Sequence, residues 1–124
     1  RRIYTYPRVQ LDAKMKARDC HWTSLNFFNE QPDDRFTDRD TAVSTIQRDY
    51  YAVHDSPRLG DLVLLLRDGK EAIHSAVYIA ADLVFTKNGA RESAPWMLMK
   101  VEDMKAYYPS ENPLHVVYLR HKDL

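Results

Sequence analysis

The stretch PRLGDLVLLLRDGKEAIHSAVYIAADLVFTKNG, residues 57–89, carries the densest β-strand signal in the chain. It contains three short apolar runs, at 62–66, 73–80 and 83–86. Runs of this length, bounded by turn-forming residues such as Asp68-Gly69, are typical of buried strands. The stretch therefore predicts three consecutive strands. One titratable side chain, His74, lies near the start of a strand that is otherwise apolar.

The composition places the chain among ordinary globular domains. Of its 124 residues, 44% are hydrophobic and 29% are charged, which is close to the average for folded domains. The 18 basic residues balance the 18 acidic ones, so the charge gives no argument for nucleic acid or for a membrane surface. No apolar run approaches the roughly 20 residues of a membrane span. We expect one domain over residues 1–124, as a monomer, without a nucleic-acid partner or a membrane span.

The cysteine and histidine content limits the possible chemistry. Because Cys20 is the only cysteine, it forms no intramolecular disulfide and belongs to no multi-cysteine zinc site. His54, His115 and His121 have no metal-ligand spacing with a carboxylate cluster, so we expect neither a metal nor a cofactor. The sequence starts at Arg1 without an initiator Met or an apolar segment. It is therefore compatible with a chain whose export signal has been removed, in the periplasm or outside the cell.

Helical and further strand signals surround the central stretch. Spacing and caps predict helices over 20–28, 40–50 and 101–107, the first capped by Asp19 and the second by Asp38 or Asp40. Weaker signals predict an edge strand at 3–6, a helical turn at 11–18, a β-prone segment at 51–54, a loop at 91–95 leading into 96–99, and a last strand at 114–120. Helices followed by a mostly antiparallel sheet make an α+β arrangement.

Cys20 opens the first predicted helix. Unpaired backbone N–H groups and the helix dipole at such a position stabilise an anion, which lowers a thiol pKa and raises the thiolate fraction that a nucleophile needs. Asp19 beside it acts in the opposite direction. A free cysteine is also commonly a small buried side chain. Position alone therefore leaves both a catalytic and a packing role open.

The neighbours of His74 depend on the register of the predicted hairpin. A loop at 80–82 puts Thr86 and Asn88 on the same sheet face as His74, with Asn88 directly opposite and Thr86 one pair away. A two-residue turn puts Phe85 and Lys87 there instead. Either of the two polar side chains could bond one imidazole nitrogen and leave the other for a cysteine. His21, next to Cys20, points about 100° away on a helix, and we expect it to be exposed.

Four sequence elements in order resemble the NlpC/P60 superfamily of cysteine peptidases and amidases. The pair DC at 19–20 resembles the family's Asp-Cys at a helix start, and PRLGDLV at 57–63 resembles its Pro-x-x-Gly-Asp-Leu element. The segment HSAVYI at 74–79 resembles its histidine strand, and LVFT at 83–86 its returning strand. The resemblance covers residues 19–89. It departs from the family where His21 and Trp22 replace the usual Ser-Gly, and where Thr86 stands in place of a common histidine.

The resemblance implies a papain-like α+β fold of the NlpC/P60 type and a set of site residues. Cys20 would be the nucleophile and His74 the general base, with Thr86 or Asn88 orienting the imidazole. Enzymes of this family usually cleave amide bonds in bacterial cell-wall peptides, often beside a γ-linked D-glutamate, so the expected partner is a peptide or peptidoglycan substrate. The alternative is a catalytically inactive binding or structural domain on the same fold, which the unusual third residue favours.

Overall fold

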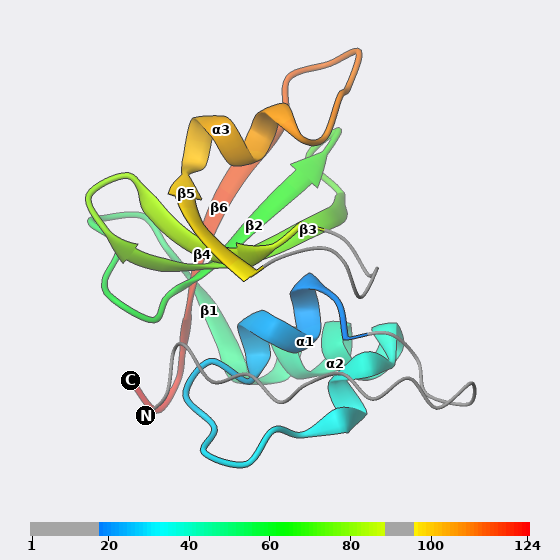
Figure 1. Cartoon of the computed structure of the whole chain (residues 1–124), viewed down its shortest axis with the longest axis vertical. Helices are drawn as coiled ribbons and strands as arrows, with labels where there is room; N and C mark the ends of the chain where they lie inside the picture. Colours follow the sequence, from blue (N-terminus) through cyan, green and yellow to red (C-terminus); the bar gives the residue numbers. More distant parts are fainter. Residues whose placement is uncertain (1–17, 89–95) are drawn as a thin grey trace.

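The computed structural model describes residues 18–88 and 96–124 (Figure 1). In chain order the elements are α1 (Cys20–Leu25), the 3-10 helix η1 (Asp34–Thr37), α2 (Arg39–Asp49), β1 (Tyr50–Val53), β2 (Leu62–Arg67), β3 (Glu71–Ala80), β4 (Leu83–Lys87), β5 (Trp96–Lys100), α3 (Val101–Ala106) and β6 (His115–His121).

The strands form one six-stranded sheet in the order β1-β6-β2-β3-β4-β5. All neighbouring strands are antiparallel. Figure 1 shows α1 and α2 on one side of this sheet and α3 on the other. The expected α+β class is confirmed. The finer prediction, a papain-like NlpC/P60 fold, stays a prediction.

The three strands predicted within 57–89 are β2, β3 and β4, and two other expectations need correction. The helix expected over 20–28 ends at Leu25, and the Asn26 side chain then donates to the Trp22 carbonyl oxygen at 3.0 Å. Residues 96–100 form strand β5 instead of continuing a loop. Their sequence, WMLMK, has no β-branched residue, and they become a strand by pairing with β4. The elements expected at 3–6 and within 11–17 lie outside the described residues.

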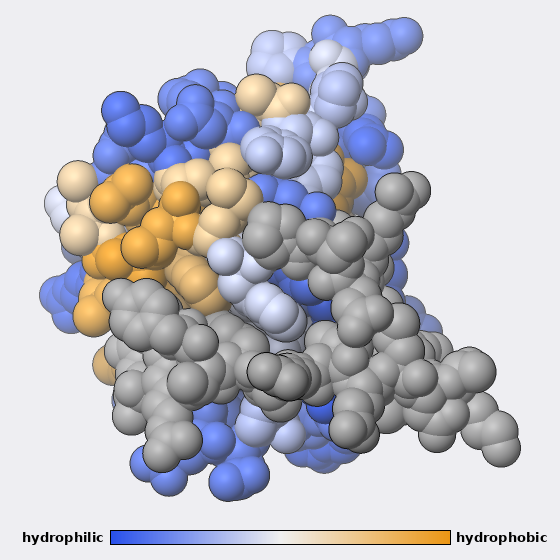
Figure 2. Space-filling view, in the orientation of Figure 1, coloured by the Kyte–Doolittle hydropathy of each residue, from blue (hydrophilic) through white to orange (hydrophobic). Residues whose placement is uncertain are grey.

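Strand β5 lies at one edge of the sheet and keeps an apolar surface. Its Leu98 side chain is 50% exposed. Figure 2 shows apolar side chains gathered over the part of the sheet that holds β4 and β5.

The two faces of β3 pack against different helices. Val77 packs with Phe27, which follows α1, whereas Ala76 lies in a core cluster with Met104 of α3. Because side chains alternate along a strand, His74 shares the α3 face with Ala76, and Ser75 shares the α1 face with Val77. Neighbouring residues of this strand therefore reach opposite sides of the sheet.

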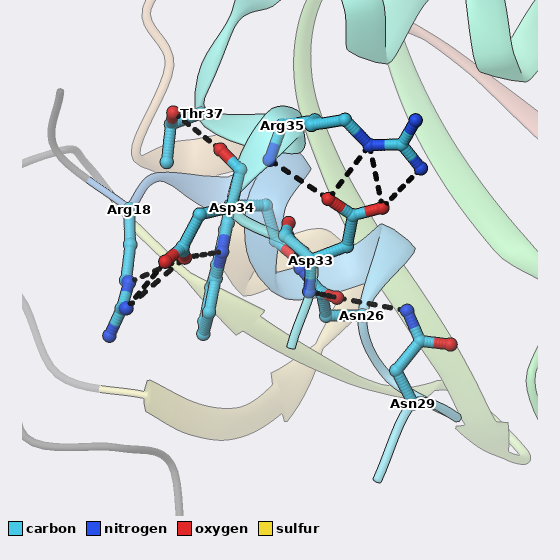
Figure 3. Close-up of polar contacts among 8 residues, drawn as sticks. Arg18, Asn26, Asn29, Asp33, Asp34, Arg35 and Thr37 are labelled. Carbon is cyan, nitrogen blue, oxygen red and sulfur yellow. Dashed lines mark hydrogen bonds and ion pairs between the residues drawn. The ribbon is translucent and has the colours of Figure 1, made fainter. Parts of the chain in front are cut away.

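Polar contacts fix the segment after α1 (Figure 3). The Asn26 side chain accepts a hydrogen bond from the Asp33 backbone N–H at 2.6 Å and donates to the Asp33 carbonyl oxygen at 3.1 Å. Asp34 accepts from the Trp22 indole N–H at 3.0 Å and forms an ion pair with Arg18 at 3.1 Å. These bonds tie the first helix to η1 and so hold the helix start that carries Cys20.

The Gly60-Asp61 pair has a structural role at the start of β2. The Asp61 carboxylate is fully buried and accepts two hydrogen bonds from the Arg120 guanidinium of β6, at 2.9 and 2.7 Å. It also accepts from the Arg58 backbone N–H at 2.7 Å. A bidentate arginine–carboxylate pair is among the stronger polar contacts in proteins, so it fixes β2 against β6.

We expect Gly60→Ala to destabilise the protein more than Gly69→Ala. Gly60 has a φ of 94°, and a Cβ there would lie 2.2 Å from Cζ of the Phe28 ring. Gly69 has a φ of 68° with no atom within 4 Å of such a Cβ. The left-handed backbone costs about 1–2 kcal/mol at either position, and only Gly60→Ala also displaces Phe28. Urea denaturation of both variants measures the difference, and equal losses would contradict the packing role of Phe28.

Candidate active site

Cys20 is the first residue of α1 and is buried, with 7% of its surface exposed. The Asp19 side chain caps the helix and accepts the backbone N–H groups of His21 and Trp22, both at 3.0 Å. The capping carboxylate therefore uses donors that would otherwise stabilise an anion at the helix start.

The helix start does not produce a low thiol pKa. Burial, followed by the Asp19 charge, raises the pKa of Cys20 to about 11, although hydrogen bonds from Ser75 and from the His21 backbone oppose the increase. The expectation of a lowered pKa is therefore wrong for this state. The six residues of α1 give a small dipole, and desolvation outweighs it.

His74 is fully enclosed and both ring nitrogens have a partner. Its Nε2 lies 2.7 Å from Thr86 Oγ1, and its Nδ1 lies 2.8 Å from Tyr108 Oη. The Tyr108 ring stacks on the imidazole with centroids 4.5 Å apart and planes at 28°. Burial, and to a smaller extent His21, lower the pKa of His74 to about 3, so the imidazole is neutral.

Hydrogen-bond counting assigns the tautomer of His74. The Thr86 hydroxyl donates its one hydrogen to the Ser75 carbonyl oxygen at 3.1 Å. Thr86 Oγ1 must then accept from His74, which puts the proton on Nε2. Nδ1 carries the lone pair and accepts from the Tyr108 hydroxyl.

The pairing of β3 with β4 puts Thr86 and Asn88 on the same face as His74, which is the placement expected for a three-residue loop. The turn itself has a different structure. Val77 pairs with Phe85 and Tyr78 with Val84, whereas Ala80 pairs with Leu83. The turn itself has two residues, but Ile79 is an extra residue in β3 beyond it. Beyond Ile79 the residues pair as they would with a three-residue loop, so Thr86 lies on the same face as His74. Continuing the register puts Asn88 opposite His74.

Thr86 and Asn88 have different relations to the imidazole. Thr86 bonds it directly. Asn88 reaches it only through Tyr108, whose hydroxyl lies 3.4 Å from Asn88 Oδ1. The Asn88 amide nitrogen lies 3.6 Å from the Met97 sulfur and 3.2 Å from the Met99 sulfur.

His21 is buried, so the expectation that it is exposed is wrong. Its Nδ1 lies 2.8 Å from Ser75 Oγ, and Ser24 Oγ lies 3.1 Å from the same oxygen. Burial, opposed by Asp19 and supported by Arg39, lowers the pKa of His21. The side of α1 that carries His21 packs against β3. His21 and Ser75 are 54 positions apart, so no local sequence pattern indicates this contact.

Lys87 and Tyr108 are two further residues near Cys20 that sequence reasoning missed as site residues. Lys87 is fully buried, with its ammonium 5.7 Å from the Trp96 ring centroid. Burial lowers the pKa of Lys87, and Asp19 and Cys20 oppose the change. Burial, and then the negative charge of an ionised Cys20, raise the pKa of Tyr108. Both side chains are therefore close enough to Cys20 to respond to its charge.

Tyr108 connects His74 to Asn88, whereas Thr86 bonds the imidazole directly and Cys20 lies outside this hydrogen-bonded set. Within residues 18–88 and 96–124, no hydrogen bond connects the Cys20 sulfur to the His74 ring. His74, Thr86 and Tyr108 form a continuous hydrogen-bonded set, and Asn88 lies at its end. Chemically, this part of the molecule offers a neutral thiol, a neutral imidazole of defined tautomer and a tyrosine hydroxyl bonded to that imidazole.

Neither a metal centre nor a membrane helix is evident among the described residues. No three histidine, cysteine, aspartate or glutamate side chains there gather as metal ligands. No helix in that part of the chain is long and apolar enough to cross a membrane.

Comparison with known proteins adds no relative: no family model, no curated protein and no solved structure matches the chain.

We expect alkylation of Cys20 by iodoacetamide to be slow at pH 7 and to rise up to about pH 11, following the raised pKa. Only the thiolate reacts, and an ordinary thiol with a pKa near 8.5 would carry roughly 300-fold more thiolate at neutral pH. Intact mass measured over time at each pH gives the rate, because Cys20 is the only cysteine. The urea-unfolded chain is the control. A rate already constant from pH 6 to 8 would contradict the neutral thiol.

Proposed function

We propose that this protein is a cysteine hydrolase that cleaves amide bonds, with bacterial cell-wall peptides as its substrate class. The observation that carries the proposal is the environment of His74. The ring is held by Thr86 in a tautomer whose Nδ1 carries the lone pair, and Cys20 begins a helix that packs against the same strand, β3, from its other face. The order of these residues along the chain is that of the NlpC/P60 family, which supports the choice of substrate.

The mechanism follows from the proton positions. The mechanism requires the Cys20 thiol and His74 Nδ1 to come together. Nδ1, once it is free of Tyr108, then takes the thiol proton, and the sulfur attacks the amide carbonyl carbon. The imidazolium then keeps its Nε2 proton on Thr86 and gives the Nδ1 proton to the leaving amine. Water, deprotonated by Nδ1, hydrolyses the thioester and releases the acid and the free thiol. Thr86 is anchored by its bond to the Ser75 carbonyl oxygen, so the ring keeps its orientation through both steps.

An inactive binding or structural domain is the second candidate, and one observation favours it. Both members of the pair are neutral in this state, because the pKa of Cys20 is about 11 and that of His74 about 3. A thiolate–imidazolium pair, which many cysteine hydrolases use, is therefore not present at rest.

Hydrolysis of defined peptides distinguishes the two candidates. The protein is incubated with muropeptides that contain the L-Ala-γ-D-Glu bond, and with control peptides that have only α-linked L-residues. Mass spectrometry then detects fragments that have gained one water. Cleavage that requires Cys20 supports the hydrolase. Binding of the same muropeptides without cleavage, seen by calorimetry, would replace it with the binding domain.

A further inference from the structure

Tyr108 is placed to control the base of the proposed reaction. It follows α3, is half-buried and packs against the core cluster that contains Met104. From there its hydroxyl reaches His74 Nδ1 at 2.8 Å while its ring stacks on the imidazole. The contact joins residues 34 positions apart, on the sheet face that α3 covers.

The hydroxyl has one hydrogen and two acceptors within reach. His74 Nδ1 is 2.8 Å away and Asn88 Oδ1 is 3.4 Å away. The shorter bond is the stronger one, so in the resting state the tyrosine hydroxyl donates its hydrogen bond to the lone pair of Nδ1. This is the lone pair that must accept the proton of Cys20. A small rotation of the tyrosine hydroxyl towards Asn88 would release it.

We propose that Tyr108 is a removable cap on His74, whose hydroxyl occupies the Nδ1 lone pair until it turns away to Asn88. This inference rests on the proposed function, because it assigns a regulatory contact to the base of that reaction. Substrate entering the site supplies a new acceptor or a new contact for the tyrosine, and the base becomes free only then. Asn88 thus receives the displaced hydroxyl and does not itself orient His74.

Alkylation of Cys20 tests the cap without any substrate. Tyr108→Phe keeps the stacked ring and removes the hydroxyl, so Nδ1 can take the thiol proton and the thiolate fraction rises. We expect iodoacetamide to react with this variant roughly twofold to tenfold faster than with the wild type at pH 7.5, the range of one net hydrogen bond. Tyr107→Phe is the matched control, because Tyr107 is 57% exposed and should leave the rate unchanged.

A second substitution shows whether the gain passes through the imidazole. In the double variant Tyr108→Phe with His74→Gln, the gain should disappear. An unchanged or slower rate in Tyr108→Phe would overturn the cap, and so would a gain that survives without His74. If Tyr108→Phe does not fold, imidazole ¹⁵N spectra of the wild type decide: a proton on Nε2 and a hydrogen-bonded Nδ1 support the cap, and a proton on Nδ1 overturns it.

These results are independent of hydrolysis. If Tyr108→Phe speeds alkylation as expected but the protein cleaves no muropeptide, the proposed function is wrong and the Tyr108–His74 cap stands. If the protein cleaves muropeptides but Tyr108→Phe leaves the alkylation rate of Cys20 unchanged, the proposed function stands and the cap is wrong.

Discussion

Cys20→Ala is expected to abolish hydrolysis of a susceptible muropeptide, lowering kcat/KM by roughly 10⁴-fold or more, as loss of the nucleophile does in other covalent hydrolases. The sulfur is the atom that forms the bond to the substrate, and no other cysteine is available to replace it. Initial rates of fragment release, followed by mass spectrometry, give the ratio to the wild type.

The fold must be shown to survive this change. Cys20 is buried, and removing its sulfur leaves only a small space, so the variant should still unfold cooperatively in urea. Cys20→Ser keeps nearly the same shape with a poorer nucleophile and should be almost as inactive. Turnover that persists in either variant would show that another residue is the nucleophile and would contradict the proposed mechanism.

Asp61→Ala is expected to lower the free energy of unfolding by about 3–5 kcal/mol, the usual result of breaking a buried ion pair. The carboxylate is fully buried, and its removal takes both carboxylate acceptors away from the Arg120 guanidinium. Hydrogen bonding to Asp61, with a smaller contribution from Tyr51, raises the pKa of Arg120 in the wild type. In the variant the arginine stays charged because its ordinary pKa is far above neutral, and it has lost its carboxylate partner.

The control for this prediction is an exposed pair in the same sheet. Glu71 of β3 lies 3.7 Å from Arg67 of β2, and both side chains are about half exposed. Pairs of this kind contribute little because water and salt screen them. Urea denaturation should show Glu71→Ala close to the wild type and Asp61→Ala far below it. Similar midpoints for the two variants would contradict the structural role of Asp61.

The local signals of the sequence were sufficient for the elements of the sheet and for the helix caps. The apolar runs at 62–66, 73–80 and 83–86 correspond to β2, β3 and β4, because a strand buried on both faces needs apolar residues in succession. Asp19 and Asp38 cap the helices, since a side-chain acceptor needs only backbone N–H groups two or three residues away. Strand β5 was missed because its pairing with β4, not its own residue preferences, makes it a strand.

The candidate site was predicted in part. The sequence pointed to Cys20, His74, Thr86 and Asn88, and the register places the last three near one another. It could not indicate Tyr108, because nothing between positions 74 and 108 shows that the chain after α3 returns over His74. Nor did it indicate the burial of His21, which depends on the angle at which α1 packs on β3.

The stretch 57–89 therefore determined by itself that this chain builds a sheet around a histidine-bearing strand, because apolar runs and turn residues act over a few positions. Only the tertiary structure decided the chemical state of that histidine. The irregularity at Ile79 set the face on which Thr86 lies, and the return of the chain after α3 put the Tyr108 hydroxyl on Nδ1. Both depend on packing between elements distant in sequence, and desolvation there, more than residue type, makes the thiol and the imidazole neutral.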